Sequence, residues 1–460
     1  MHTFSGAAAP DLRALMAGAV LAPGEEGYAE AVAPFNLAVP RRPALVAVAQ
    51  DAADVAAAVR FARRHRLPVA VQATGHGAVG PDEGALLVNT AALDHIAIDP
   101  VARTARIGAG VRFGALLEAA APHGLAPLTG SAPAVGVVGY TLGGGLSPVG
   151  RALGYAADHV RALEVVTADG RIRQVDAAHE PDLFWALRGG KGGFGIVTSM
   201  TVGLFSVRSL FAGAVYYAGE DAPEVLRAWR NWSAELPERS TTSVALLRLP
   251  PLPELPEPLR GRFVVAVRYA HVGAPEEGAA LLVRLHGALG EVRPVLDGTG
   301  EIPFAAIGSV HADPTDPMPV WERGLLFDDL PETALGALVK TAGADADEPP
   351  FMVEIRQLGG ALSRQPEGGN AVGGRDAVYS LLVVGAPPPE ELTSLVAPAG
   401  ARVIDALRPC SRDAALPNFL GSAPSPADIA AAWPPAVRDR LRAVKAAYDP
   451  SGLFRFGCGH

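Results

Sequence analysis

The spacing of hydrophobic positions divides the chain into two regions. Between residues 41 and 205, short apolar runs alternate with longer amphipathic stretches. This pattern predicts helices at 51–64, which Asp51 begins as an N-cap, and at 113–122. It predicts strands at 44–49, 68–72, 86–89, 97–99, 103–107, 160–167 and 172–175. The strands are too irregularly spaced for one simple parallel sheet, which indicates an α+β region.

After about residue 206 the pattern changes to strands separated by helices and Pro-rich loops. The predicted strands are 212–217, 243–249, 262–271, 350–357 and 377–384. They indicate an antiparallel sheet with helices packed on one side. One helix is predicted for the tail at 426–445. Near the start, residues 14–22 favour a helix over a secretion signal, because only Arg13 precedes them closely and acidic residues follow.

Composition and charge exclude several classes of protein. Of the 460 residues, 39 are basic and 48 acidic, a net charge of −9. This acidic balance, without a basic run, argues against a nucleic-acid partner. No apolar run approaches the roughly 18 residues of a membrane span, so a cytoplasmic location is expected. Two cysteines, Cys410 and Cys458, cannot build a disulfide framework or a zinc cluster, and no metal site is expected.

Glycine is abundant, with 52 residues, and it is clustered. Residues 130–154 hold eight glycines among apolar residues, and residues 189–195 hold five. A third loop, residues 72–77, follows a predicted strand. Flexible linkers are polar, so these segments are better read as loops whose backbone contacts a large ligand. Three such loops suit an extended dinucleotide. Gly108 and Gly110 resemble a Rossmann turn, but the next glycine, Gly114, comes one residue too late.

His76 is the first candidate for chemistry, because it stands between Gly75 and Gly77. Two flanking glycines let backbone N–H groups approach an anion while the imidazole reaches forward. Taken alone, this histidine fits an ordinary hydrogen-bonded loop residue better. Its weight comes from the motifs that accompany it.

Together these motifs resemble a known family. The segment 72–77 resembles the glycine-rich histidine loop of vanillyl-alcohol-oxidase, or PCMH-type, flavoproteins. Segments along the rest of the chain resemble the berberine-bridge-enzyme-like branch of this family, particularly its bacterial members. These are TLGGG (141–145), ADH (157–159), PDLFWALRGGKGGFGIV (181–197), EIRQLGGA (354–361), NFL (418–420) and YDPSGLFRF (448–456).

The resemblance implies a fold and a cofactor. The fold would be α+β, with a PCMH-type FAD-binding domain at 1–205 completed by 410–460, and an inserted substrate-binding domain at 206–409. His76 would bond covalently to the flavin 8α-methyl group. The residues expected to hold FAD are Gln72, Ala73, Thr74, Gly75, His76, Gly77, Val135, Gly136, Gly139, Tyr140, Leu142, Gly145, Gly195, Ile196 and Val197.

Several positions depart from the family pattern. Ala132 stands where many plant members carry a second flavin-linking cysteine, so only one covalent link is expected. Ser363 and Arg364 occupy the region of the plant catalytic glutamate. Leu416 replaces a frequent tyrosine, and the usual C-terminal asparagines are missing from residues 457–460. These departures leave most of the flavin site intact, and the acid–base residues of the plant enzymes do not carry over to this chain.

The resemblance implies an FAD-dependent oxidase that transfers a hydride from a small organic substrate, such as a specialised-metabolite alcohol or phenol, to flavin N5, with dioxygen as electron acceptor. The alternatives are a carbohydrate oxidase, a dehydrogenase with another acceptor, or a redox-silent flavoprotein cyclase or scaffold. Candidate catalytic residues are Glu354, Tyr140 and Asn418, with Gln357 and Tyr379 as weaker candidates. For Glu354 an ion pair with Arg356 is an equal alternative, and for Tyr140 a place in the core. The oligomeric state is not predicted.

Overall fold

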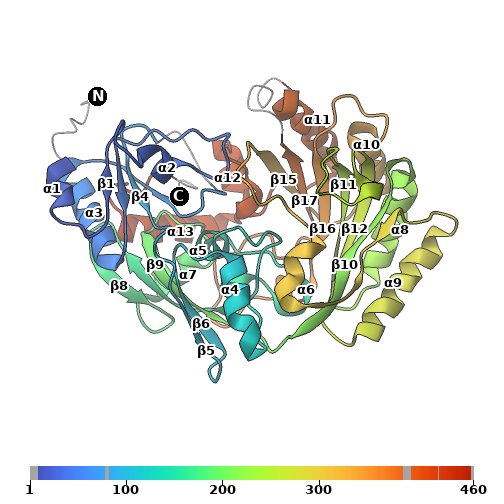
Figure 1. The fold of residues 1–460 in the computed structure, drawn as a ribbon, viewed down its shortest axis with the longest axis horizontal. Coiled ribbons are helices and arrows are strands. Elements are labelled where there is room, and N and C mark those ends of the chain that lie inside the picture. Colours follow the sequence, from blue (N-terminus) through green and yellow to red (C-terminus); the bar gives the residue numbers. More distant parts are fainter. Residues whose placement is uncertain (1–8, 78–81, 387–394, 423, 457–460) are drawn as a thin grey trace.

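The computed structural model describes residues 9–77, 82–386, 395–422 and 424–456, which form two lobes (Figure 1). The first lobe contains two sheets. One has the order β1 (Val20–Leu21), β2 (Leu45–Val48), β4 (Leu86–Asn89), β3 (Val69–Gln72). The other has the order β5 (Ile96–Asp99), β6 (Thr104–Gly108), β9 (Ile196–Gly203), β7 (Val160–Val166), β8 (Ile172–Val175).

Helices from both ends of the chain complete the first lobe. The helix α13 (Pro435–Tyr448) returns from the second lobe to contact α7 (Pro181–Leu187). Trp433, Leu441 and Val444 enter the same hydrophobic core as the strands. The helices of this lobe are α1 (Ala9–Arg13), α2 (Tyr28–Val32), α3 (Ala52–His65), α4 (Phe113–Ala120), α5 (Val137–Leu142), α6 (Gly150–Leu153), α7 (Pro181–Leu187), α12 (Pro426–Ala431) and α13 (Pro435–Tyr448).

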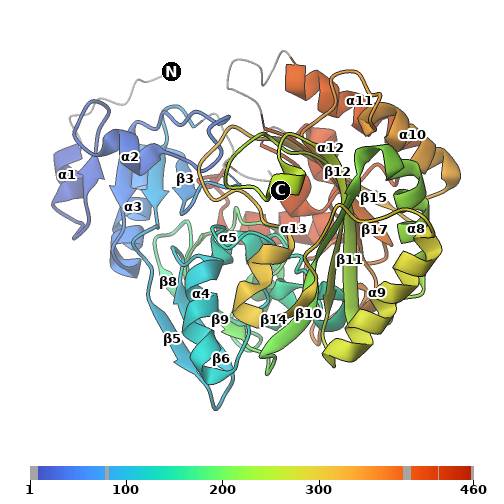
Figure 2. The same cartoon turned by 45° about the vertical axis from the view of Figure 1, so that its right-hand side comes forward.

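The second lobe is one antiparallel sheet with helices on its outer face (Figures 1 and 2). Its strands run in the order β13 (Leu296–Asp297), β10 (Ser209–Ala218), β12 (Phe263–His271), β11 (Ser240–Arg248), β16 (Met352–Gln357), β17 (Tyr379–Gly385), β15 (Trp321–Phe327), and β14 (Gly300–Pro303) also pairs with β10. The covering helices are α8 (Ala222–Ala234), α9 (Pro275–Leu289), α10 (Glu332–Ala342) and α11 (Ala397–Leu407).

Alternation along these strands assigns the two faces of the sheet. Val244, Leu246 and Val265 belong to the core under the helices, whereas Ala245 and Ala266 belong to a core shared with the first lobe. Side chains of successive strand residues point to opposite faces. The neighbouring positions Ser243, Arg268, Glu354 and Arg356 therefore face the first lobe.

The structure confirms the α+β class and the predicted strands, whose ends differ by a few residues. The helix predicted for 14–22 is wrong. There α1 ends at Arg13, and β1 pairs with β2. A Cβ on Gly18 would lie 1.9 Å from the Val48 carbonyl oxygen, so the chain turns closely onto β2.

The prediction of a single tail helix is also wrong, because the structure has two helices there, one ending at Ala431 and the next beginning at Pro435. Two consecutive prolines, Pro434 and Pro435, interrupt helical hydrogen bonding there. The strands β9 and β15, and the short strands β1, β13 and β14, were not predicted.

Candidate active site

The loop after β3 carries His76. Its imidazole stacks on Phe35, with ring centroids 3.8 Å apart and planes inclined by 13°. Nδ1 lies 2.9 Å from Thr74 Oγ1, while Nε2 is buried and has no hydrogen-bond partner among the described residues. Burial, with a smaller contribution from the charge of Arg112, lowers the pKa of His76 to about 4. At neutral pH the ring is therefore uncharged, the form in which an imidazole can act as a nucleophile.

Packing against the segment 34–36 explains the glycine before this histidine. Gly75 has a φ of 72°, and a Cβ there would lie 2.5 Å from Pro34 Cα. The backbone N–H of Phe35 donates to the Thr74 carbonyl (3.0 Å), and that of Asn36 donates to the Gly75 carbonyl (3.3 Å). Gly75 thus permits the contact that places Phe35 against the imidazole.

Tyr140 and Asn418, two of the predicted catalytic residues, are in contact. The Asn418 amide donates to the Tyr140 carbonyl (2.8 Å), and the Tyr140 hydroxyl donates to the Leu146 carbonyl (2.8 Å). A Cβ on Gly143 would lie 2.1 Å from Asn418 Oδ1, so this glycine is required for the contact. Burial raises the pKa of Tyr140 to about 12, which keeps it a neutral phenol. These bonds order the glycine-rich loop.

Glu354 lies at the centre of a buried cluster of charges. It accepts hydrogen bonds from Ser243 Oγ, Arg268 Nη1 and Arg356 Nε, each 2.7 Å long. Burial alone would raise the pKa of Glu354, but Arg356, Arg268 and His311 hold it well below its ordinary value of 4.5. The side chain is therefore a permanent carboxylate, better suited to holding cations than to accepting a proton near neutral pH. The ion pair with Arg356 exists, and a catalytic role stays a prediction.

A small cavity of about 20 Å³ adjoins this cluster where the two lobes meet. The first lobe contributes residues 146–148 of the glycine-rich loop, and the large sheet contributes the rest. The lining residues are Leu146, Ser147, Pro148, Thr241, Thr242, Ser243, Arg268, Tyr269, Ala270, Val310, His311, Arg356 and Gln357.

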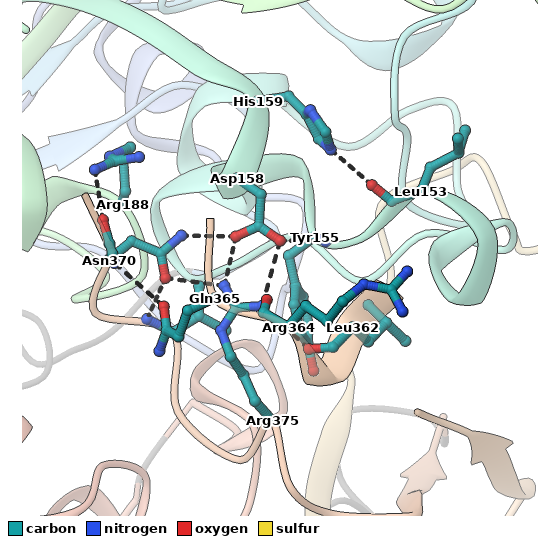
Figure 3. A network of polar contacts seen from close by, with 12 residues as sticks. Leu153, Tyr155, Asp158, His159, Arg188, Leu362, Arg364, Gln365, Asn370 and Arg375 are labelled. Carbon is teal, nitrogen blue, oxygen red and sulfur yellow. Dashed lines mark hydrogen bonds and ion pairs between the residues drawn. The ribbon is translucent and has the colours of Figure 1, made fainter. Parts of the chain in front are cut away.

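A second polar network, drawn in Figure 3, lies next to the glycine-rich loop of residues 130–154. Asp158 pairs with Arg375, both side chains being 7% exposed, and accepts a hydrogen bond from Asn370 Nδ2 (2.7 Å). The backbone N–H groups of Ala156 and Ala157 donate to the carbonyls of Gly145 and Gly144 (3.0 and 2.9 Å). The network thus joins this loop to the segment 364–375.

Other predicted flavin residues have side chains or Cα positions engaged by the protein itself. Gln72 is buried and its amide donates to the Ala33 carbonyl (3.0 Å), while Ile196 and Val197 turn their side chains into hydrophobic cores. A Cβ on Gly195 would lie 2.7 Å from the Val165 side chain, so packing explains that glycine. Any contact of residues 195–197 with a ligand must use the backbone.

The two weaker catalytic candidates, Gln357 and Tyr379, lie next to each other across strands β16 and β17.

Sequence reasoning offered Arg356 as a partner of Glu354 but missed two others, Arg268 and His311. Arg268 and His311 are distant in sequence from Glu354 but lie within 3.2 Å of it. The signal for Arg268 was present, since it is a lone charge in the apolar run VVAVRYA.

A further acidic residue, Glu322, lies on β15, where burial raises its pKa against the opposing charges of Lys191, Arg323 and Arg356. The described part of the chain contains no cluster of three His, Cys, Asp or Glu able to hold a metal.

Comparison with known protein families finds a match that covers the His76 loop and the glycine-rich loop. Residues 43–176 match the family model of the FAD binding domain. The chain carries an FAD binding domain. This match includes both the His76 loop and the segment 130–154, in agreement with the resemblance seen in the sequence.

Curated relatives agree with the oxidoreductase class. The chain is 30% identical over 229 residues, 49% of its length and 51% of the relative's, to an uncharacterized FAD-linked oxidoreductase of Bacillus subtilis. A second such protein of B. subtilis is 27% identical over 96% of both chains. An (R)-6-hydroxynicotine oxidase of Paenarthrobacter nicotinovorans is 34% identical over 44% of both chains. In the first and third comparisons, the chain spans about half of the relative's length.

Solved structures confirm the fold. The 6-hydroxy-D-nicotine oxidase of Arthrobacter nicotinovorans superposes with a TM-score of 0.82 at 24% identity, covering 96% of this chain and 97% of that one. A berberine-bridge-enzyme-like protein of Physcomitrella patens gives 0.85 at 19% identity over 97% of both chains. The whole chain therefore has the PCMH-type, berberine-bridge-enzyme-like fold.

The residues of the FAD binding domain fit a flavin. The buried Nε2 of His76 lacks a protein partner. Gly77 and Gly139 are exposed, and a Cβ on either would meet no atom within 4 Å. The segment 72–77 and α5 therefore offer bare backbone near the unpartnered Nε2 of His76. No helix in the described ranges is both long and apolar enough to cross a membrane.

Proposed function

We propose that this protein is an FAD-dependent oxidase of a small organic substrate, with the flavin held covalently by His76 alone. The observation that carries the proposal is the neutral, half-buried imidazole of His76, whose buried Nε2 has no partner among the described residues, within the matched FAD binding domain. Ala132 at the second linking position supports a single link. Bound FAD would supply the electron acceptor for oxidation of a substrate C–H bond.

The chain's own residues would form the substrate site at the junction of the lobes. In this proposal residues 72–77, 135–145 and the backbone of 195–197 hold FAD. Tyr140 and Glu354 stand behind the substrate site, where they bond to the lining residues Leu146 and Arg356, and Asn418 in turn holds Tyr140. The Tyr140 hydroxyl gives its proton to the Leu146 carbonyl and keeps its oxygen as an acceptor, and Glu354 fixes two arginines. The domain limits 1–205 with 410–460, and 206–409, stay predictions, as does the cytoplasmic location.

A specialised-metabolite alcohol or phenol is the proposed substrate, and dioxygen the proposed acceptor. The name of the 6-hydroxynicotine oxidase relative supports an oxidase of a small aromatic compound. Carbohydrate oxidases share the fold, including a xylooligosaccharide oxidase from Myceliophthora thermophila at 21% identity and a TM-score of 0.83, so the fold alone does not choose between these classes.

Acid precipitation tests the covalent link. The denatured wild-type protein should carry its yellow colour into the precipitate, and His76→Ala should release that colour into the supernatant. His123→Ala, which changes an exposed histidine of the same lobe, serves as the matched control and should retain it. Wild-type colour in the supernatant would reject the His76 link.

A second measurement tests the acceptor. Substrate-reduced protein should regain its yellow colour on admission of air and release hydrogen peroxide. A preparation that stays bleached in air would exclude the oxidase and favour a dehydrogenase. A preparation that converts substrate without ever bleaching would favour the redox-silent cyclase.

A further inference from the structure

The inner face of the large sheet carries a second carboxyl group besides Glu354. On β15, Leu325 and Phe327 belong to the core under the helices, whereas Leu326 belongs to the core shared with the first lobe. Since strand side chains alternate, Glu322 points to the same face as Leu326, toward the first lobe. Glu322 and Glu354 therefore both face the junction of the lobes.

The carboxylate of Glu322 has no direct partner. Among the described residues, none donates a hydrogen bond to it or forms an ion pair with it. Its side chain is only half-buried, yet burial is the main cause that raises its pKa. A carboxylate that is surrounded by protein and still reached by solvent lies in a recess. Glu322 is thus placed where a ligand can reach it.

Segments of the first lobe border this recess. Lys191, whose charge acts on Glu322, belongs to the glycine-rich segment before β9. A Cβ on Gly421 would lie 3.9 Å from Glu322 Cγ, and Asn418, three residues earlier, supports the other glycine-rich loop by its contact with Gly143. Two of the predicted flavin segments therefore lie close to Glu322.

Three cations act on Glu322 through space, and each is held by another group. These contacts join Lys191 to the Pro417 carbonyl (2.7 Å), Arg323 to Asp428 (2.9 Å) and Arg356 to Glu354 (2.7 Å). The neighbour of Glu322 on β17, Val384, carries no charge. The cations therefore weaken the effect of burial on the pKa of Glu322 without cancelling it.

We propose that Glu322 is the catalytic base, the group that accepts the hydroxyl proton of the substrate. The inference rests on the proposed function, which places the substrate at the junction of the lobes, and deepens it by naming the proton acceptor.

The proton and the electrons of the substrate take separate routes. The substrate O–H bond breaks, its proton joins a carboxylate oxygen of Glu322, and its electron pair becomes the second bond of the C=O group. The hydrogen of the neighbouring C–H bond leaves as a hydride to bound FAD. Hydride, proton and dioxygen, the proposed acceptor, together give one hydrogen peroxide, and Glu322 returns to its carboxylate form.

The two carboxyl groups of this face are suited to different tasks. Glu354 is saturated with hydrogen bonds from Ser243 and two arginines, and against the effect of burial these cations hold its pKa well below 4.5, so it is a weak base. Burial raises the pKa of Glu322 and makes its carboxylate the stronger base. Two carboxyl groups whose surroundings move their pKa values apart are typical of an acid–base site.

Calorimetric titration of the flavin-loaded protein with phenol and with fluorobenzene tests the assignment. These probes have nearly the same size, but only phenol has an O–H group to donate. Wild-type protein at pH 8 should bind phenol at least about tenfold more tightly, a free-energy difference of about 1.4 kcal/mol, because a hydrogen bond to an ionised acceptor is strong. The preference should shrink as the pH falls toward 4.5, where Glu322 takes up a proton.

The variant Glu322→Gln should lose most of the preference and its dependence on pH. It should fold, because a neutral amide replaces a carboxyl group whose ionisation burial disfavours. Glu332→Gln, which changes an exposed carboxyl group on α10, is the matched control and should keep both properties. On any alcohol that the wild type oxidises, kcat/KM of Glu322→Gln should fall by about 100-fold or more.

Equal binding of the two probes by the wild type at pH 8, or an unchanged preference in Glu322→Gln, would overturn the inference. The outcome is separable from that of the proposed function. Release of the flavin by acid would reject the covalent link and leave the phenol measurement intact. Absence of the phenol preference in the wild type would reject Glu322 as the base and leave the flavin link intact.

Discussion

Phe35 and His76 come from different segments of the chain and stack nearly parallel, with ring centroids 3.8 Å apart. The contact is set by backbone hydrogen bonds from residues 35 and 36 to the loop that holds the histidine. Asn36 extends this link to the second lobe, because its side chain bonds to both the N–H and the carbonyl of Val320 (3.0 Å each). The orientation of the imidazole thus depends on the segment 35–36, which contacts both lobes.

Replacing Phe35 should therefore impair flavin attachment more than folding. Phe35→Ala removes the surface that holds the imidazole plane, and we expect a smaller fraction of acid-stable flavin with a nearly native circular dichroism spectrum. Phe35→Tyr keeps the ring and should keep the attached fraction. An unchanged fraction in Phe35→Ala would show that the stacking does not position His76.

The glycine-rich loops could be predicted from the sequence because their signal is local. Eight glycines within residues 130–154 are visible without a fold, and the structure uses them for close contacts, such as Gly143 against Asn418. The reason for Gly75 could not be predicted. It depends on the approach of Pro34, which no local pattern encodes.

The charge cluster escaped prediction because it is assembled by strand pairing. Glu354 and Arg356 share a strand, so their ion pair could be offered as an alternative, but Arg268 joins them only through the register of β11, β12 and β16. The strand β15 was missed because Glu322, Arg323 and Gly324 interrupt its apolar pattern. Glu322 and Arg323 lie at the partly buried end of the strand, whereas Gly324 is buried, where a Cβ would lie 2.9 Å from Phe419 Cβ.

Removing Arg375 should destabilise the protein strongly. Arg375→Gln leaves Asp158 buried without its cation, and losing one partner of such a pair costs about 3–5 kcal/mol. Denaturant unfolding should show this loss in the free energy of unfolding. Arg375→Gln combined with Asp158→Asn removes both charges and should recover most of it, whereas a double variant as unstable as the single one would contradict the ion-pair explanation.

Glu354→Gln should lower stability in a pH-dependent way. The folded state holds the pKa of Glu354 well below 4.5, so its ionisation stabilises the fold above that pH, and the contribution is lost as pH falls. We expect the variant to be less stable than wild type by about 3–5 kcal/mol at pH 7, and the difference to narrow below pH 4.5. A constant difference across pH 3–7, measured by denaturant unfolding, would argue against a permanently ionised Glu354.

Glu322→Gln should have the opposite effect. Burial raises the pKa of Glu322 in the folded state, although Lys191, Arg323 and Arg356 partly oppose this. Above pH 4.5 the unfolded chain ionises this carboxyl more readily than the folded chain does, so ionisation favours unfolding. The variant should therefore melt at a higher temperature than wild type at pH 8 and at the same temperature at pH 4. Glu332→Gln, an exposed carboxyl whose pKa its arginine neighbours lower, is the matched control and should not gain stability at pH 8. A lower melting temperature for Glu322→Gln at pH 8 would mean that the neighbouring cations outweigh burial, and that Glu322 is ionised in the folded protein.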